Sequence, residues 1–150
     1  MEVSFGIPMS LFKRIDIIKR REAMTVDPER FREQYEPARK ELRERITKAR
    51  ELLPRVATPK HVYDLIAQIC IDFNVDGHRA DIIIERAARA NAAFEGRIEV
   101  SADDVVVGSE MALPHRMRRT PYEEEEFSEE MLRKLVKRRE LEILEGSRKG

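Results

Sequence analysis

Signals that start and end helices recur along this chain and constrain its fold more than any other feature. Asp27-Pro28 and Thr58-Pro59 each put a proline in the first turn of a helix, where its missing N–H is tolerated. Gly96 stands where a left-handed helix C-cap belongs. Between these signals apolar residues recur at steps of three and four, which is the period of a helix. We therefore predict an all-α fold.

The N-terminal part of the chain is predicted to be a long helical arm. After a short alternating stretch at residues 2–7, Ser10 can cap a helix that runs to about Met24. A second helical pattern covers residues 28–53 and, at ~1.5 Å per residue, would extend about 40 Å, more than a compact domain of this size needs. Pro37 interrupts this pattern, so we expect a kink or two abutting helices there.

A compact helical bundle is predicted over residues 57–114. Its apolar positions are Val62, Leu65, Ile66, Ile69, Cys70 and Phe73 in the first helix, Ile82, Ile83, Ala87, Ala90 and Phe94 in the second, and Val105, Val106, Ser109, Ala112 and Leu113 in the third. Alanines between 87 and 93 would let a neighbouring helix approach closely. Ser101 begins a capping-box-like start, and the extended stretch at 97–100 could pair with residues 55–57.

The chain thus divides into residues 1–56, 57–114 and 115–150, the last being a charged tail with a terminal helix. That helix, at 128–145, carries few apolar residues, so a solvated extension is favoured slightly over a docking helix for another subunit. The tail also contains an arginine group and an acidic run, which we interpret as a self-neutralising link rather than a nucleic-acid patch. These residues are Arg116, Arg118 and Arg119, followed by Glu123–Glu126.

Composition excludes several classes of protein. The 29 Lys and Arg balance the 29 Asp and Glu, which argues against a dedicated nucleic-acid binder. No apolar run approaches the ~18–20 residues that span a bilayer, and the single cysteine, Cys70, points to a reducing cytoplasm. Phosphate-loop, zinc-protease and serine-hydrolase motifs are absent, and the three histidines share no short metal spacing. We predict no catalytic residue and no metal ligand.

One segment suggests an anion site. Gly77 permits a tight turn, after which His78 and Arg79 fall in the first turn of a helix. A cation there opposes the helix dipole unless an anion compensates, and the free N–H groups of that turn also face an anion. Either Arg79 lies near a phosphate, or it pairs with Asp76 or Asp81 and fixes the loop.

Several segments together resemble a known family. Gly77-His78-Arg79-Ala80-Asp81, continuing to Glu95-Gly96-Arg97, and Leu113–Arg119 are similar to the C-terminal lid of the AAA+ ATPase subunit of magnesium chelatase, or of a close cobalt chelatase-like relative. The segment Ile17–Glu22 is similar to the linker of that family, and the resemblance covers roughly residues 2–122. It implies an AAA+ lid-type helical bundle with a long N-terminal helical arm and a charged C-terminal helix.

The resemblance implies a function. Such subunits form ATP-dependent rings that work with other chelatase subunits to insert a metal into a tetrapyrrole. Arg79 would be the second nucleotide sensor, with Gly77, His78 and Asp81 in support. ATP and Mg²⁺ would belong to the complete ATPase, so this chain is not expected to bind a cofactor or to be an enzyme on its own. Its partners would be the AAA+ core, neighbouring ring subunits and other chelatase subunits, with no membrane and no nucleic acid.

The sequence also departs from that family. The nucleotide loop, the magnesium-binding carboxylates and the arginine finger are absent, so we expect an excised domain or a natural fragment. One alternative is a stand-alone helical protein-interaction module that uses 28–53 and 128–145 without nucleotide dependence. A weaker alternative is a helical DNA-binding domain that uses Arg116–Arg119.

Overall fold

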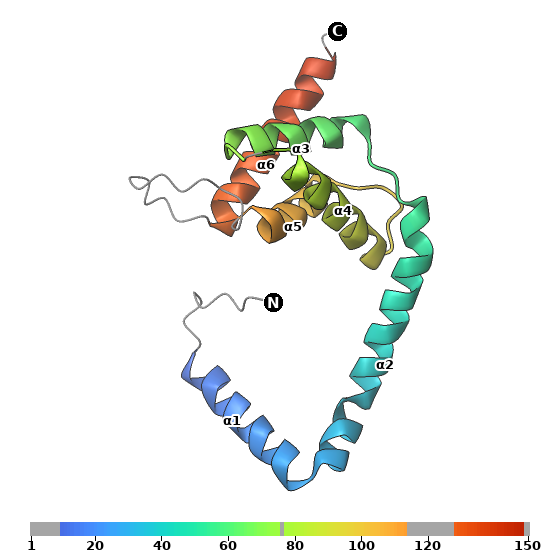
Figure 1. Cartoon of the computed structure of the whole chain (residues 1–150), viewed down its shortest axis with the longest axis vertical. Coiled ribbons are helices and arrows are strands. Elements are labelled where there is room, and N and C mark those ends of the chain that lie inside the picture. Colours follow the sequence, from blue (N-terminus) through green and yellow to red (C-terminus); the bar gives the residue numbers. More distant parts are fainter. Residues whose placement is uncertain (1–9, 76, 114–127, 149–150) are drawn as a thin grey trace. The chain divides into compact units, whose positions relative to one another are not determined.

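The computed structural model describes residues 10–75, 77–113 and 128–148, which form six α-helices and one short 3-10 helix (Figure 1). The helices are α1 (Leu11–Val26), α2 (Pro28–Leu52), η1 (Leu53–Arg55), α3 (Lys60–Asp72), α4 (Arg79–Phe94), α5 (Ala102–Ala112) and α6 (Glu129–Arg148). The all-α prediction is confirmed. The short alternating stretch at 2–7 and the charged link at 116–126 lie outside the described residues.

The chain forms two units, which are described separately: residues 1–44 and residues 45–150. In the first unit the predicted caps are present. The Ser10 hydroxyl accepts a hydrogen bond from the Lys13 N–H at 3.4 Å, and the Asp27 carboxylate accepts one from the Arg30 N–H at 3.0 Å. No residue of α1 is buried. Helix α2 continues without a break through Pro37, so the alternative of two abutting helices is wrong.

The second unit is a bundle in which α4 lies beside α5 and α3 crosses α6 (Figure 1). The apolar stripe predicted for α3 is confirmed. Val62, Leu65, Ile66, Ile69 and Cys70 are buried, and Phe73 is partly buried against the same core. This stripe forms one wall of the bundle because its residues recur at steps of three and four.

The apolar face predicted for α4 is partly wrong. Ile82 is 51% exposed and Ala90 is exposed, whereas the buried positions are Ala80, Ile84, Ala88, Ala92 and Ala93. The reason is the close approach of α5, which the alanines were expected to permit. A Cβ added to Gly108 of α5 would lie 2.7 Å from the Ile84 carbonyl oxygen, so the α5 position opposite this carbonyl has room only for glycine.

The connections around the bundle follow the predicted signals. Gly96 adopts φ +76° after α4, as a left-handed C-cap requires. The predicted pairing of two extended stretches is also present, as a parallel bridge between Ala57 and Glu99. In it the Ala57 N–H donates to the Ile98 carbonyl at 2.9 Å, and the Val100 N–H donates to the Ala57 carbonyl at 3.0 Å.

A buried carboxylate fixes the start of α5. Ser101 and Asp104 form the predicted capping box, and Asp104 is fully buried. Its carboxylate accepts hydrogen bonds from both terminal nitrogens of Arg97, at 2.6 and 2.7 Å, from the Asn91 side chain at 2.7 Å, and from the Ser101 N–H and hydroxyl at 2.8 and 2.9 Å. Burial alone would raise the pKa of Asp104, but these hydrogen bonds lower it below its ordinary value.

The prediction that the C-terminal helix is a solvated extension is wrong. Leu132 and Val136 of α6 are buried in the bundle core, and Leu135 and Ile143 pack against it. An ion pair also holds α6 on α3, since the Arg139 guanidinium donates to both Asp72 carboxylate oxygens at 2.7 and 2.8 Å. A narrow apolar stripe is enough to pack α6 on the bundle, because the rest of this helix faces solvent. The predicted boundaries at 56/57 and 114/115 stay predictions.

Candidate functional site

The residues predicted to form an anion site surround the N-terminus of α4. Gly77 adopts φ +73°, a left-handed conformation that favours glycine. His78 is the N-cap residue, its side chain makes no capping hydrogen bond, and Arg79 is the first residue of the helix. All three are exposed. The first N–H groups of α4 have no partner within the helix, so this end can receive an anion.

The Arg79 side chain is available to a ligand. It is exposed, and within the described part of the chain it forms no hydrogen bond or ion pair. The alternative in which Arg79 pairs with Asp81 is therefore not observed. Asp76, the other predicted partner, lies outside the described residues. A free guanidinium offers five donors in a planar fork, which suits the oxygen atoms of a phosphate or a carboxylate.

Asp81 lies on the other side of this turn, towards α3. Burial is the main cause that raises the pKa of the Cys70 thiol to about 12, and the charge and hydrogen bonding of Asp81 raise it further. Asp81 is half-buried, in contrast to Arg79. Cys70 is consequently a protonated thiol at neutral pH, and it is buried at the apolar position of α3 that the sequence predicts.

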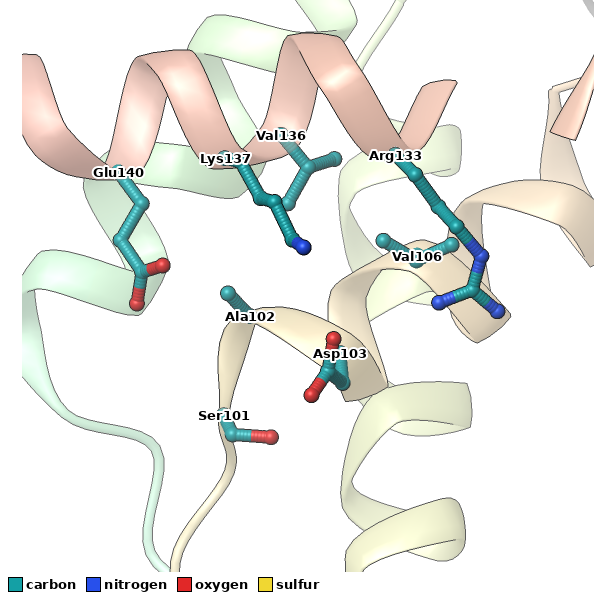
Figure 2. Close-up of a pocket in the computed structure, with 8 residues that line it drawn as sticks. All are labelled: Ser101, Ala102, Asp103, Val106, Arg133, Val136, Lys137 and Glu140. Carbon is teal, nitrogen blue, oxygen red and sulfur yellow. The ribbon is translucent and has the colours of Figure 1, made fainter. Parts of the chain in front are cut away.

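A separate pocket, which sequence reasoning missed, lies between the start of α5 and α6. It has a volume of about 200 Å³ and is lined by Ser101, Ala102, Asp103, Val106, Arg133, Val136, Lys137 and Glu140. Figure 2 shows Arg133 and Lys137 extending from α6 towards the α5 side of the pocket. Its charges are mixed, and Arg133 pairs with Glu129 at 2.8 Å. The apolar residues of α6 were the sequence signal that could have predicted this pocket, because the pocket forms only where α6 packs on the bundle.

The described residues lack two other classes of feature. Among residues 10–75, 77–113 and 128–148, no group of three or more His, Cys, Asp or Glu side chains could hold a metal ion. No described helix combines the length and apolarity that crossing a membrane requires. Neither Gly77 nor the residues that follow it in the predicted site line the pocket between α5 and α6.

Comparison with known proteins gives consistent matches. The AAA lid domain family matches residues 63–135, a range that includes the first part of α6. The chain is 42% identical over 123 residues to a magnesium-chelatase subunit ChlI homolog of Methanocaldococcus jannaschii, covering 82% of this chain and 34% of that protein. It is 38% identical over 117 residues to the magnesium-chelatase 38 kDa subunit of Rhodobacter capsulatus, covering 78% and 33%.

A third relative, the chloroplastic magnesium-chelatase subunit ChlI of Chlamydomonas reinhardtii, is 41% identical over 111 residues, which is 74% of this chain and 27% of that protein. The chain spans about a third of the length of the relatives it matches. The match therefore concerns one part of those subunits. Residues 63–135 thus match the AAA lid domain family, and the chain is similar, over most of its length, to part of magnesium-chelatase ChlI subunits.

Proposed function

We propose that this domain is the lid of an AAA+ ATPase subunit and that Arg79 is its second nucleotide sensor. The observation that carries the proposal is the exposed Arg79 guanidinium, which has no ion pair within the described residues and stands on the first turn of α4. An arginine at this position is costly for the helix alone, because it opposes the helix dipole. A phosphate beside it removes that cost.

The role of Arg79 would be electrostatic and mechanical. Its guanidinium would neutralise charge on the nucleotide phosphates, so the lid would close when ATP is bound and relax after hydrolysis. Gly77 and His78 would set the direction in which the helix starts, and Asp81 would hold the turn on α3. ATP and Mg²⁺ would be held by the nucleotide-binding part of the subunit, and this domain would not be catalytic alone.

The wider setting follows from the names of the relatives, which are called subunits of magnesium chelatase. In that setting the lid would contribute to an oligomeric ATPase that drives metal insertion into a tetrapyrrole with other chelatase subunits. The cytoplasm is the compartment we propose for a chain whose single cysteine is a buried thiol.

The proposal is tested in a complete subunit. The matched segment of the Methanocaldococcus jannaschii relative is replaced by the corresponding 123 residues of this chain, and ATP turnover of the chimera is measured. Losing one charge-assisted contact of about 1.5–3 kcal/mol should lower kcat/KM for ATP about 10- to 150-fold in Arg79→Ala. The matched control is Arg50→Ala, which removes another exposed arginine with no ion pair in the described residues. Equal turnover in both variants would contradict the sensor role.

A second candidate function is a helical protein-interaction module without nucleotide dependence. The observation that favours it is the apolar surface of α1, where Leu11 is 71% and Phe12 83% exposed. This candidate predicts that Leu11→Ser weakens assembly of the chimera while Arg79→Ala changes neither assembly nor ATP turnover. Sedimentation and turnover measured on the same two variants separate the two functions.

A further inference from the structure

Glu110 of α5 has a buried carboxylate oxygen without a hydrogen-bond partner. Its Oε1 atom is shielded from solvent and accepts no hydrogen bond within the described residues. Glu110 follows Val106 by four positions, and Val106 lines the pocket between α5 and α6, so both residues belong to the side of α5 that faces α6. A buried polar atom with no partner is uncommon in a folded protein and calls for an explanation.

The guanidinium whose charge acts on this carboxylate belongs to Arg133 of α6, and it is already bound to another acid. The Arg133 Nε donates to a Glu129 carboxylate oxygen at 2.9 Å, and its Nη2 lies 2.8 Å from the same oxygen. Glu129 and Arg133 are four residues apart on α6, a spacing at which an acid and a base pair readily. Two carboxylates therefore compete for one guanidinium, and Glu129 is the one that holds it.

The surroundings of Glu110 oppose its ionisation. Burial is the main cause that raises the pKa of Glu110, the charge of Glu129 raises it further, and Arg133 offsets only part of this increase. Among the described residues, no charged group of α3 or α4 contributes. Ionised Glu110 consequently weakens the packing of α6 on α5, because opening this contact hydrates the carboxylate and separates it from Glu129.

A different contact holds the middle of α6 on α3. Arg139 donates to both carboxylate oxygens of Asp72, at 2.7 and 2.8 Å. The hydrogen bond from Arg139 is the main cause that holds the pKa of Asp72 below its ordinary value, so this ion pair stays formed from about pH 5 upwards. On the α5 side, in contrast, Arg133 lines a pocket of about 200 Å³, so the two helices are not close-packed there.

We propose that Glu110 makes the attachment of the start of α6 to α5 depend on proton binding. With Glu110 protonated, residues 129–136 stay docked on α5. With Glu110 ionised, this segment opens more often, while the Arg139–Asp72 pair keeps the rest of α6 on α3. The inference is independent of the nucleotide-sensing role of Arg79.

The test measures hydrogen exchange of the 150-residue chain by mass spectrometry between pH 5 and pH 8. The rates are corrected for the intrinsic effect of pH on amide exchange, so they report how often each segment opens. We expect the opening of residues 129–136 to become at least about threefold more frequent as Glu110 ionises. At each pH this opening should be at least about tenfold more frequent than that of residues 84–92 in α4, as a local opening requires.

Three variants assign the effect. Glu110→Gln should remove the increase with pH, because the side chain no longer ionises. Glu129→Gln should remove it as well, because Arg133 is then free to pair with Glu110. The matched control is Glu145→Gln, which changes an exposed acid near the end of the same helix and should keep the increase. Histidine side chains titrate in the same range, and their effect cancels in the comparison because every variant retains them.

Two results would overturn the proposal. One is an increase with pH that persists in either Glu110→Gln or Glu129→Gln. The other is equal corrected exchange in residues 129–136 and residues 84–92, because the bundle would then unfold as a whole instead of opening at α6. Neither result bears on Arg79, whose role is measured by ATP turnover of the chimera.

Discussion

Removing the buried carboxylate of Asp104 should lower the free energy of unfolding of the bundle more than substituting an exposed residue does. Asp104 is fully buried and accepts five hydrogen bonds, two of them from Arg97. Breaking a buried ion pair from one side costs about 3–5 kcal/mol. Because the Arg97 side chain is 40% exposed and can be rehydrated, we expect Asp104→Ala to cost about 3 kcal/mol, including the lost capping box.

The assay is urea denaturation of the 150-residue chain followed by circular dichroism. The matched control is Asp103→Ala, which removes the neighbouring exposed carboxylate and should cost less than about 1 kcal/mol. A cost of ~3 kcal/mol is a large part of the ~5–15 kcal/mol that stabilises an ordinary domain. Equal unfolding midpoints for the two variants would refute the reasoning that Arg97, Asn91 and Ser101 depend on Asp104.

The same carboxylate gives the bundle an acid-sensitive stability. The pKa of Asp104 is lower in the folded chain than its ordinary value, so the unfolded chain takes up the proton first as the pH falls. Its contribution is complete above the ordinary carboxyl pKa of about 4 and is lost as the pH falls through the folded-state pKa. Asp104→Asn should therefore flatten the dependence of unfolding free energy on pH below about pH 4.

Three further substitutions test the packing of the bundle by the same denaturation assay. Leu132→Ala should lower the free energy of unfolding by about 2–5 kcal/mol, whereas Leu141→Ala, at 61% exposure on the same helix, should change it by no more than about 0.5 kcal/mol. Similar losses for the two variants would contradict the packing of α6 on the bundle. Gly108→Ala, whose Cβ would lie 2.7 Å from a backbone oxygen of α4, should cost about 1–3 kcal/mol, whereas Gly146→Ala, with open space around it, should be neutral or stabilising. Burial, with help from the charge of Glu129, raises the pKa of Glu110 in the folded chain. Ionised Glu110 therefore destabilises the fold, and this loss of unfolding free energy is absent below the ordinary pKa of the group and grows as the pH rises through its folded-state pKa. Glu110→Gln should therefore raise the urea midpoint at pH 7 and leave it unchanged near pH 3.

Local signals predicted the helices and their caps well. Asp27-Pro28, Ser101 and Gly96 act within one helical turn, and each does in the structure what its residue type predicts. The α3 stripe was equally clear because its apolar residues are large and evenly spaced. These features depend on neighbours in sequence, so one sequence is enough to read them.

Features that depend on a partner helix were predicted less well. In α4 Ile82 faces outwards while Ile84, a residue of the same type, is fully buried, because the side of α4 that faces the bundle is set by α5, whose Gly108 lies against the Ile84 carbonyl. In α6 few apolar residues indicated a solvated helix, but Leu132 and Val136 fill the core and Arg139 pairs with Asp72 of α3, far away in the sequence. The pocket beside α6 was missed for the same reason.

The candidate site was found because its residues are contiguous. Gly77, His78, Arg79 and Asp81 meet at one helix end in any structure that starts a helix there. Sequence left open whether Arg79 pairs with Asp81, since that depends on side-chain direction. The structure directs Asp81 towards Cys70 of α3 and leaves Arg79 in solvent.

The most direct test of the central claim compares the affinities for ATP and ADP of the full-length chimera with and without Arg79. Fluorescence titration with labelled nucleotides gives both dissociation constants for the unsubstituted chimera, Arg79→Ala and the control Arg50→Ala. If Arg79 binds the terminal phosphate, removing its side chain should weaken the binding of ATP by about 10-fold or more and the binding of ADP far less. The preference for ATP over ADP should then shrink. If Arg79→Ala weakens neither nucleotide, or weakens both to the same extent as Arg50→Ala, Arg79 is not the nucleotide sensor.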